Sequence, residues 1–353
     1  MTPDERTAAA LGEVETRLHD FVNRGAARAT RHSPYYSELW RTMRTAVSGG
    51  KRVRPRLLLS CFTQLTNADD EAAIQLAVAI ELLHTALLVH DDIIDGDDER
   101  RGSPNLVGAF RSAGRTAGLG AAQAERWGET AGILAGDLLL MSALRMGVLP
   151  DLDRRRADRI AELLDESIFR AAAGELADVA YASGLTTPSV GEIREMMADK
   201  TAHYSLELPL RAAAVLADAG LEIEERLGAV GRSLGILFQM QDDLLGVFGD
   251  PDRTGKSTSG DLREGKQTLL VAFARDTPAW ASAAGRFGDP ALDEAGAESL
   301  RQALELSGAR TSFEAEIRRE RDQAVRLIRT AGLPADLEQA LCRAAEQAIE
   351  RHA

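Results

Sequence analysis

Two acidic clusters stand far apart in the sequence, and basic residues follow each of them. The first reads DDIIDGDDERRG from Asp91 to Gly102, and the second reads DDLLG from Asp242 to Gly246. Mg²⁺ prefers oxygen ligands and commonly bridges one or two carboxylates to substrate phosphates, while Arg and Lys bind phosphate oxygens directly. The two clusters therefore predict a site that holds a diphosphate through Mg²⁺, provided that they face each other across a shared cavity.

The spacing of the first cluster places its acids on one face of a helix. His84, Asp91 and Asp95 stand at positions i, i+7 and i+11, which fall within roughly 60° of one another at about 100° per residue. Asp92 lies about a quarter turn away, and His90 lies about 100° from Asp91, so we assign His90 a structural role. A solvated helix end is the alternative, but the apolar ALLV before His90 indicates a buried helix. We predict Asp91, Asp92 and Asp95 as metal ligands.

The second cluster is shorter and closes an apolar run, GILFQM. Gln239, Asp242 and Asp243 stand at i, i+3 and i+4 and so share one helix face. Gly246 stands where a third acid would complete the pattern. The basic residues of this region are Lys256 and Lys266. Two adjacent acids on a helix are usually a surface feature, so the prediction of Asp242 and Asp243 as metal ligands depends on the first cluster.

The elements that must position these residues are predicted to be helices, because apolar residues recur at three- and four-residue steps along most of the chain. The expected helices cover roughly 4–24, 52–66, 70–95, 128–147, 154–182, 191–218, 221–248, 261–275, 296–306, 311–331 and 335–351. We find no strand alternation of useful length and no repeat, which predicts an all-α fold. Two long loops, 98–126 and 249–260, are expected directly after the acidic clusters, where a loop can close over a ligand.

Composition narrows the function classes. The chain has 353 residues, of which 44% are hydrophobic and 27% charged, and its net charge is −13. This charge argues against nonspecific binding to nucleic acid or anionic lipid. Cys61 and Cys342 lack metal-type spacing, and we interpret them as small buried hydrophobes in a reducing compartment. The acidic N-terminus lacks an apolar leader, and no run of about 18 apolar residues indicates a transmembrane helix. We therefore expect a cytoplasmic protein.

Short motifs in a fixed order resemble one family. They are GGKRVRP at Gly49–Pro55, DDIID with its ERRG tail, GD at Gly136–Asp137, GELAD at Gly174–Asp178, KT at Lys200–Thr201, FQMQDD at Phe238–Asp243, and GKSTSGDLREGK at Gly255–Lys266. With these motifs, the chain resembles the trans-isoprenyl diphosphate synthases, also called polyprenyl synthetases, over roughly residues 45–275. The order of the motifs is far more specific than any one of them.

The resemblance implies a fold, a reaction and a set of site residues. It implies a single all-α domain over 1–353 around a central cavity, a homodimer, and head-to-tail condensation of isopentenyl diphosphate with an allylic diphosphate using three Mg²⁺. It assigns Asp91 and Asp95 to the first Mg²⁺ ions and Asp242 to a further one. The isopentenyl diphosphate pocket it implies is formed by Lys51, Arg54, His84 and Arg101. The allylic side it implies is formed by Arg100, Lys200, Thr201, Gln239, Lys256 and Lys266.

The mechanism implied by the family proceeds by ionisation, condensation and deprotonation. The allylic cation would be stabilised by the oxygens of Thr201 and Gln239 and by the Lys200 carbonyl, while helical walls exclude water. Two of these site residues have a structural alternative. Lys51 could belong to a solvated basic start of a helix, and His84 could be a core histidine whose hydrogen bonds are made within the protein. We interpret Arg52 and Arg56 as surface charge. Two departures from the family pattern are Gly246, where an acid is usual, and Glu175, where Gln is usual.

Product length is predicted from the residues that precede the first cluster. The prenyl chain should grow away from Asp91, and in the family aromatic residues at the fourth and fifth positions before the motif stop growth early. Here these positions hold Leu87 and Ala86, and Leu82 and Leu83 lie one turn deeper. A turn is about 5.4 Å, close to one isoprene unit. We predict geranylgeranyl diphosphate (C20), with C15 and C25 left open.

Two other functions remain open from the sequence. A class I terpene cyclase also uses DDxxD and Mg²⁺, but its second metal motif is not found here and the GGKRVRP element would be idle. A noncatalytic subunit that modulates a true synthase should have eroded acidic motifs, whereas the first cluster here is whole.

Overall fold

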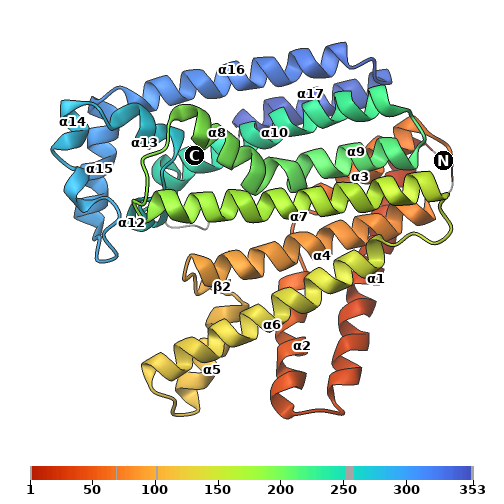
Figure 1. The fold of residues 1–353 in the computed structure, drawn as a ribbon, viewed down its shortest axis with the longest axis horizontal. Helices are drawn as coiled ribbons and strands as arrows, with labels where there is room; N and C mark the ends of the chain where they lie inside the picture. The colour runs from red at the N-terminus through yellow and green to blue at the C-terminus, as the bar shows by residue number, and fades with distance from the viewer. Residues whose placement is uncertain (1, 69, 101, 251–257, 351–353) are drawn as a thin grey trace. The chain divides into compact units, whose positions relative to one another are not determined.

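The computed structural model describes residues 2–68, 70–100, 102–250 and 258–350, and these are almost entirely helical (Figure 1). The chain divides into two compact units. Unit 1 comprises Met1–Leu164 and Ala212–Ala219, and unit 2 comprises Asp165–Arg211 and Gly220–Ala353. The all-α expectation is confirmed, and the single-domain organisation stays a prediction.

Unit 1 is built around one buried helix. Its elements are α1 (Pro3–Ala29), α2 (Pro34–Val47), α3 (Val53–Leu65), α4 (Glu71–Ile94), β1 (Glu99–Arg100), β2 (Ser103–Pro104), α5 (Leu106–Thr116), α6 (Ala121–Gly147) and the first part of α7 (Arg154–Ala182). Helix α4 packs against α6, α3 and α1, and most of its side chains are buried. An apolar surface on nearly every side of a helix requires such a central position.

Side-chain caps mark where the helices of unit 1 begin. Thr2 accepts a hydrogen bond from the backbone of Glu5, whose carboxylate accepts one from the Thr2 backbone, and this capping box starts α1. The Ser33 hydroxyl caps α2 by accepting a hydrogen bond from the backbone N–H of Tyr36, and Pro34 holds the first helical position. Such caps satisfy backbone N–H groups that have no partner within the helix.

Unit 2 is built around α10 (Leu221–Phe248), which packs against α16 and other helices of the same unit. Figure 1 shows α16 running alongside α10. The remaining elements are the end of α7, α8 (Val190–Met197), the π-helix η1 (Ala198–Glu207), the start of α9 (Leu208–Leu216), α12 (Gly260–Glu264), α13 (Leu269–Ala274), α14 (Pro278–Ala281), the 3-10 helix η2 (Ala284–Arg286), α15 (Glu294–Leu306), α16 (Ala309–Thr330) and α17 (Ala335–Glu350).

Three expectations about the elements were wrong. Helix α2 was not predicted at all, and the expected loop 98–126 instead contains a hairpin of two two-residue strands, helix α5 and the start of α6. Glycines at 102, 114, 118 and 120 suggested a loop, whereas Gly108, within α5, lies so close to the backbone carbonyl of Asp98 that only glycine fits there. The expected helix 191–218 is interrupted by the π-helix η1.

Two helices of the described chain, α4 and α6, are long and apolar enough to cross a membrane by length and composition alone. The most apolar window of α4 is 72% buried within the protein, as in the core helix of a soluble domain. The corresponding window of α6 is 39% buried. Neither helix is a clear membrane span.

Candidate active site

The first acidic cluster lies at the C-terminal end of α4. Asp91 is in its last turn and Asp95 is the residue that caps it. Ligand oxygens of the two carboxylates lie within 4.8 Å of each other, and both side chains are half-buried. Two carboxylates this close repel each other unless a cation lies between or beside them. The pair therefore fits a divalent cation, as the spacing predicted.

The buried Asp92 forms an ion pair with the half-buried Arg100 next to these carboxylates. Arg100 donates from Nε (2.9 Å) and Nη2 (2.5 Å) to Oδ1 of Asp92, and Nη2 also lies 3.2 Å from Asp91 Oδ2. Burial raises the pKa of the Asp92 carboxyl to about 6, and the Arg100 guanidinium opposes this shift. The pair fixes Arg100 beside the acids, where a diphosphate would need a cation. Metal ligation by Asp92 stays a prediction.

The GGKRVRP motif precedes and begins α3. Lys51 is exposed, and Arg54 and His84 are half-buried. Arg52 is buried and ion-paired with Glu15 and Glu81, so its interpretation as surface charge was wrong. A run of neighbouring basic residues suggested a solvated helix start, because the partners of Arg52 are distant in the sequence. Arg56 is exposed, as expected.

His90 and the predicted chain-length residues also lie in α4. His90 Nε2 lies 3.6 Å from Asp137 Oδ1, and its ring packs where Gly136 has no side chain, which supports the structural role. Close packing of α4 on α6 thus uses the GD motif. Among the predicted chain-length residues, Leu82, Leu83 and Ala86 are fully buried, and Leu87 is half-buried.

In unit 2, Lys200 bridges two acids of the GELAD motif. Its Nζ lies 3.0 Å from Glu175 Oε1 and 2.7 Å from Asp178 Oδ2. Glu175 is the residue that departs from the family pattern, and here its carboxylate accepts a charge-assisted hydrogen bond. Lys200 and its neighbour Thr201 belong to the ten-residue π-helix η1. Helices of this kind are rare, usually a single turn long, and frequent at functional sites.

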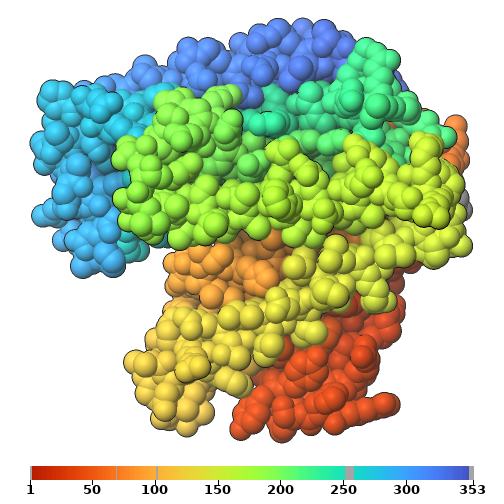
Figure 2. Space-filling model, in the orientation of Figure 1, coloured from red at the N-terminus to blue at the C-terminus, as the bar shows by residue number. Residues whose placement is uncertain are grey.

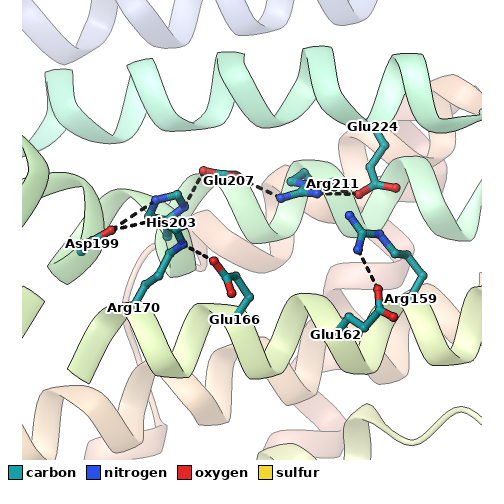
Figure 3. Close-up of polar contacts among 9 residues, drawn as sticks. All are labelled: Arg159, Glu162, Glu166, Arg170, Asp199, His203, Glu207, Arg211 and Glu224. Atoms are coloured by element: carbon teal, nitrogen blue, oxygen red, sulfur yellow. Dashed lines mark hydrogen bonds and ion pairs between the residues drawn. The ribbon is translucent and has the colours of Figure 1, made fainter. Parts of the chain in front are cut away.

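A chain of ion pairs supports this π-helix (Figure 3). Asp199 lies 3.2 Å from Arg170 and 3.5 Å from His203, and His203 Nδ1 lies 2.6 Å from Glu207. Glu207 continues to Arg211 at 3.1 Å. Burial would raise the pKa of Glu207, but its bonds to His203 and Arg211 outweigh burial and lower the pKa. Contacts between acidic and basic side chains thus follow the π-helix along its length.

The second acidic cluster lies near the end of α10. Asp242 is exposed, whereas Asp243 is buried and accepts a 2.8 Å hydrogen bond from Gln239 Nε2. Burial, together with the charge of Asp261, raises the pKa of the Asp243 carboxyl to about 8. A Cβ placed on Gly246 would lie 2.3 Å from Asp261 Oδ2. The carboxylate of Asp261 therefore occupies the space next to the missing third acid.

Asp243 gives the metal-free protein a predictable pH dependence. Its ordinary pKa is 3.8 and its folded pKa about 8, so between these values only the folded state holds the proton, and stability falls as pH rises. We expect Asp243→Asn to remove this fall. Urea unfolding in EDTA at pH 5 and pH 8 should show a decline that is larger in the wild type by more than about 1 kcal/mol. Parallel curves for the two proteins would contradict this pKa assignment.

Of three further basic residues that were predicted for the site, the structure describes only one. Lys266 Nζ lies 2.9 Å from Glu264 and 3.8 Å from Asp261. Arg101 and Lys256 lie outside the described residues. The sequence analysis did not select Asp178 and Asp261 as site residues. Both are acids inside motifs that it recognised, and this position within a motif could have identified them.

Each unit thus presents acids next to cations, and the convergence of the two clusters on one cavity stays a prediction. The sequence profile of the family described as polyprenyl synthetase matches residues 37–286. The chain belongs to this family. The expected resemblance is confirmed, and it extends beyond the range 45–275 inferred from the motifs.

Curated relatives of this polyprenyl synthetase differ in the product that their names give. The geranylfarnesyl diphosphate synthase of Aeropyrum pernix is 37% identical over 233 residues, which are 64% of this chain and 67% of the relative. The (2E,6E)-farnesyl diphosphate synthase of Mycobacterium tuberculosis is 32% identical over 294 residues, 81% of this chain and 75% of the relative. The geranylgeranyl diphosphate synthase of Saccharolobus solfataricus is 34% identical over 227 residues, 64% and 62% of the respective chains. This chain therefore spans 62% to 75% of the length of these relatives.

Solved structures of polyprenyl synthetases share the fold. A geranylgeranyl pyrophosphate synthase from Corynebacterium glutamicum, complexed with isoprenyl diphosphate and magnesium, has a TM-score of 0.88 at 27% identity and covers 97% of this chain and 98% of its own. A polyprenyl synthase from Caulobacter crescentus, complexed with calcium and isoprenyl diphosphate, has a TM-score of 0.76 at 28% identity, with 98% of both chains covered. This polyprenyl synthetase is a trans-prenyltransferase of isoprenoid biosynthesis.

Proposed function

We propose that this polyprenyl synthetase condenses isopentenyl diphosphate head-to-tail with an allylic diphosphate and releases mainly geranylgeranyl diphosphate (C20). The observation that carries the product length is the buried stretch of α4 before Asp91. Ala86 there is fully buried and small, and Leu82, Leu83 and Leu87 are of medium bulk. Helix α4 has no aromatic side chain that would stop chain growth at C15. Leu82 and Leu83, which lie one turn deeper, would limit the growth of the chain.

Replacing Ala86 by Phe is expected to shorten the product by one or two isoprene units, because the larger side chain fills the path of the growing chain. Mass spectrometry of the dephosphorylated products checks this. The matched control is Ala77→Phe, which lies about 180° around α4 and is equally buried. It should cost comparable stability and leave product length unchanged. A product spectrum unaltered by Ala86→Phe would refute this path for the chain.

Mg²⁺ would be held by Asp91 and Asp95 in unit 1 and by Asp242 in unit 2, and we propose three ions in all. Bound Mg²⁺ supplies Lewis-acid stabilisation of the diphosphate leaving group. The carboxylate spacing at the end of α4 supports the first part of this assignment. The two clusters would have to converge across one cavity, and the chain would then act as one domain over 1–353.

The other site residues have separable roles in the proposed reaction. Lys51, Arg54 and His84 bind the diphosphate of isopentenyl diphosphate and hold its double bond near the reacting carbon. The Lys200 carbonyl and the oxygens of Thr201 and Gln239 face the positive charge as it develops on the allylic carbon. The proton released after condensation goes to the departing diphosphate. Apolar helical walls exclude water from the cation.

We also propose that the protein is cytoplasmic and that it forms a homodimer. The dimer interface that we propose is formed by α6. The exposed apolar side chains on α6 and just after it follow one face, and they are Ile133, Leu134, Met141, Leu144 and Val148. Figure 2 shows α6, in yellow, at the surface of the molecule. Apolar patches of this kind on soluble proteins usually mark interaction sites. Light scattering of the wild type and of a Met141→Lys variant tests this proposal, and a monomeric wild type would end it.

Purified protein with Mg²⁺, isopentenyl diphosphate and labelled dimethylallyl, geranyl or farnesyl diphosphate tests the proposed function directly. We expect condensation with each primer and C20 as the main end product. Hydrocarbon formed from geranylgeranyl diphosphate alone would instead indicate a cyclase. Activity that appears only after a second synthase is added would indicate a modulating subunit.

A further inference from the structure

The segment that joins α2 to α3 has an unusual backbone. Gly49 and Gly50 have φ of 82° and 91°, and Arg52 has φ of 47° and ψ of 44°. Glycine adopts positive φ freely, whereas arginine is unfavourable there. A non-glycine residue persists in this region only where its surroundings hold it, and such strain concentrates at functional sites. The conformation of Arg52 therefore calls for a physical cause.

The cause is a buried fork of contacts from the Arg52 guanidinium. Nη1 donates to Glu81 Oε1 at 2.7 Å, and Nε and Nη2 donate to the two oxygens of Glu15 at 2.6 and 3.0 Å. Nη2 also donates to the Val47 carbonyl at 2.8 Å. Burial alone would lower the pKa of Arg52, but the two carboxylates outweigh it and raise the pKa. Arg52 thus fastens one short segment to α1, to the end of α2 and to α4.

Glu81 makes this fork relevant to the candidate substrate site. It is buried on α4, and its Oε2 has no hydrogen-bond partner among the described residues. Without Arg52, this carboxylate would be an uncompensated buried charge, which is strongly unfavourable. Glu81 also stands one turn before His84 on the same helix, at the i, i+3 spacing that places side chains next to each other. The bond between Arg52 and Glu81 therefore ties the segment to the turn that carries His84.

We infer that Arg52 is a positioning residue, which locks the segment 49–54 to α4 and so sets the placement of Lys51 and Arg54 relative to His84. This inference rests on the proposed function, in which those three residues hold isopentenyl diphosphate. Arg52 itself does not touch the substrate. Its guanidinium supplies four directed hydrogen bonds at once, a geometry that the single ammonium of lysine cannot reproduce.

Arg52→Lys and Glu81→Gln test the inference through steady-state kinetics with each substrate varied in turn. We expect KM for isopentenyl diphosphate to rise about tenfold or more, since displacement of a binding group by about 1 Å can cost up to about 100-fold. KM for the allylic primer should change by less than about twofold, because that pocket is held by other elements. A third variant, Arg52→Gly, keeps the positive φ without the guanidinium and should show the same rise.

Arg6→Lys is the matched control. Arg6 belongs to the same unit, is 11% exposed at its side chain, pairs with Asp70, and donates to the carbonyls of Thr66 and Ala68 at 2.9 and 2.8 Å. It is comparably enclosed but has no contact with the segment 49–54 among the bonds that the structure records. Arg6→Lys should lower the melting temperature and leave both KM values unchanged.

The outcomes separate two failures. A wild type that is inactive with every primer would overturn the proposed function before Arg52 is considered. An active wild type whose Arg52 and Glu81 variants lose stability, with both KM values unchanged or raised in parallel, would overturn the positioning role and leave the proposed function standing.

Discussion

Asp95→Asn is expected to lower kcat for condensation by about 10²- to 10³-fold, the usual cost of removing one group that stabilises charge in a transition state. The carboxylates of Asp91 and Asp95 approach within 4.8 Å, and a divalent cation beside them would offset their mutual repulsion. Asn keeps the shape and removes the charge. The Mg²⁺ concentration for half-maximal rate should rise, and circular dichroism should stay unchanged.

The matched control for Asp95→Asn is Asp158→Asn. Asp158 is an exposed acid of unit 1 that pairs with Arg154 one turn away on α7. Exposed pairs of this kind contribute little to stability, and Asp158 is not among the predicted site residues. Its loss should leave the rate and the Mg²⁺ dependence unaltered. Full activity of Asp95→Asn at the wild-type Mg²⁺ optimum would remove the first metal site from the proposal.

Gly174→Ala is expected to damage both stability and activity. An ideal Cβ on Gly174 would lie 2.1 Å from the backbone nitrogen of Lys200, so α7 and the π-helix would have to separate. Overpacking of this kind costs about 1–3 kcal/mol, and a shift of about 1 Å in Lys200 could cost up to about 100-fold in rate. Urea unfolding and primer-dependent kinetics measure the two effects.

Gly12→Ala controls for the change of residue type. Gly12 lies within α1, and an added Cβ there meets no atom within 4 Å. Alanine should therefore stabilise the helix by about 0.5–1 kcal/mol, with no change in kinetics. If Gly174→Ala behaves like Gly12→Ala, the backbone of the π-helix is not held in place by α7.

Sequence periodicity predicts those helices whose own residues are apolar enough to require burial. The range 70–95 was predicted and α4 spans Glu71–Ile94, because most of its side chains are apolar. The missed α2 carries Tyr35 and its arginines on the exposed side, and its buried face consists of few residues. In α5, glycines suggested a loop, but they permit close approach to neighbouring backbone.

Local spacing also predicts the parts of the site that lie within one helix turn of each other. The proximity of Asp91 and Asp95 follows from a four-residue step, and so does the bond from Gln239 to Asp243. The burial of Asp243 and the exposure of Asp242 do not follow from spacing, because they depend on the helices that surround α10.

Long-range partners explain what the sequence could not reveal. The π-helix has an ordinary helical pattern in the sequence, which does not reveal that Gly174 approaches its backbone or that charged side chains flank it. Arg52 looks like one of several basic residues until Glu15 and Glu81 are placed beside it. Glu175, the departure from the family pattern, accepts a hydrogen bond from Lys200, which lies 25 residues away in the sequence.

The division of the chain into units has a consequence for biosynthesis. Unit 1 comprises Ala212–Ala219 as well as Met1–Leu164, and between these stretches the ribosome delivers 165–211, which belong to unit 2. Nascent chains generally fold one domain at a time from the N-terminus. Here the first unit is incomplete until the early part of the second has already emerged. A gene fragment that ends at residue 164 would therefore encode a core that lacks one of its own pieces.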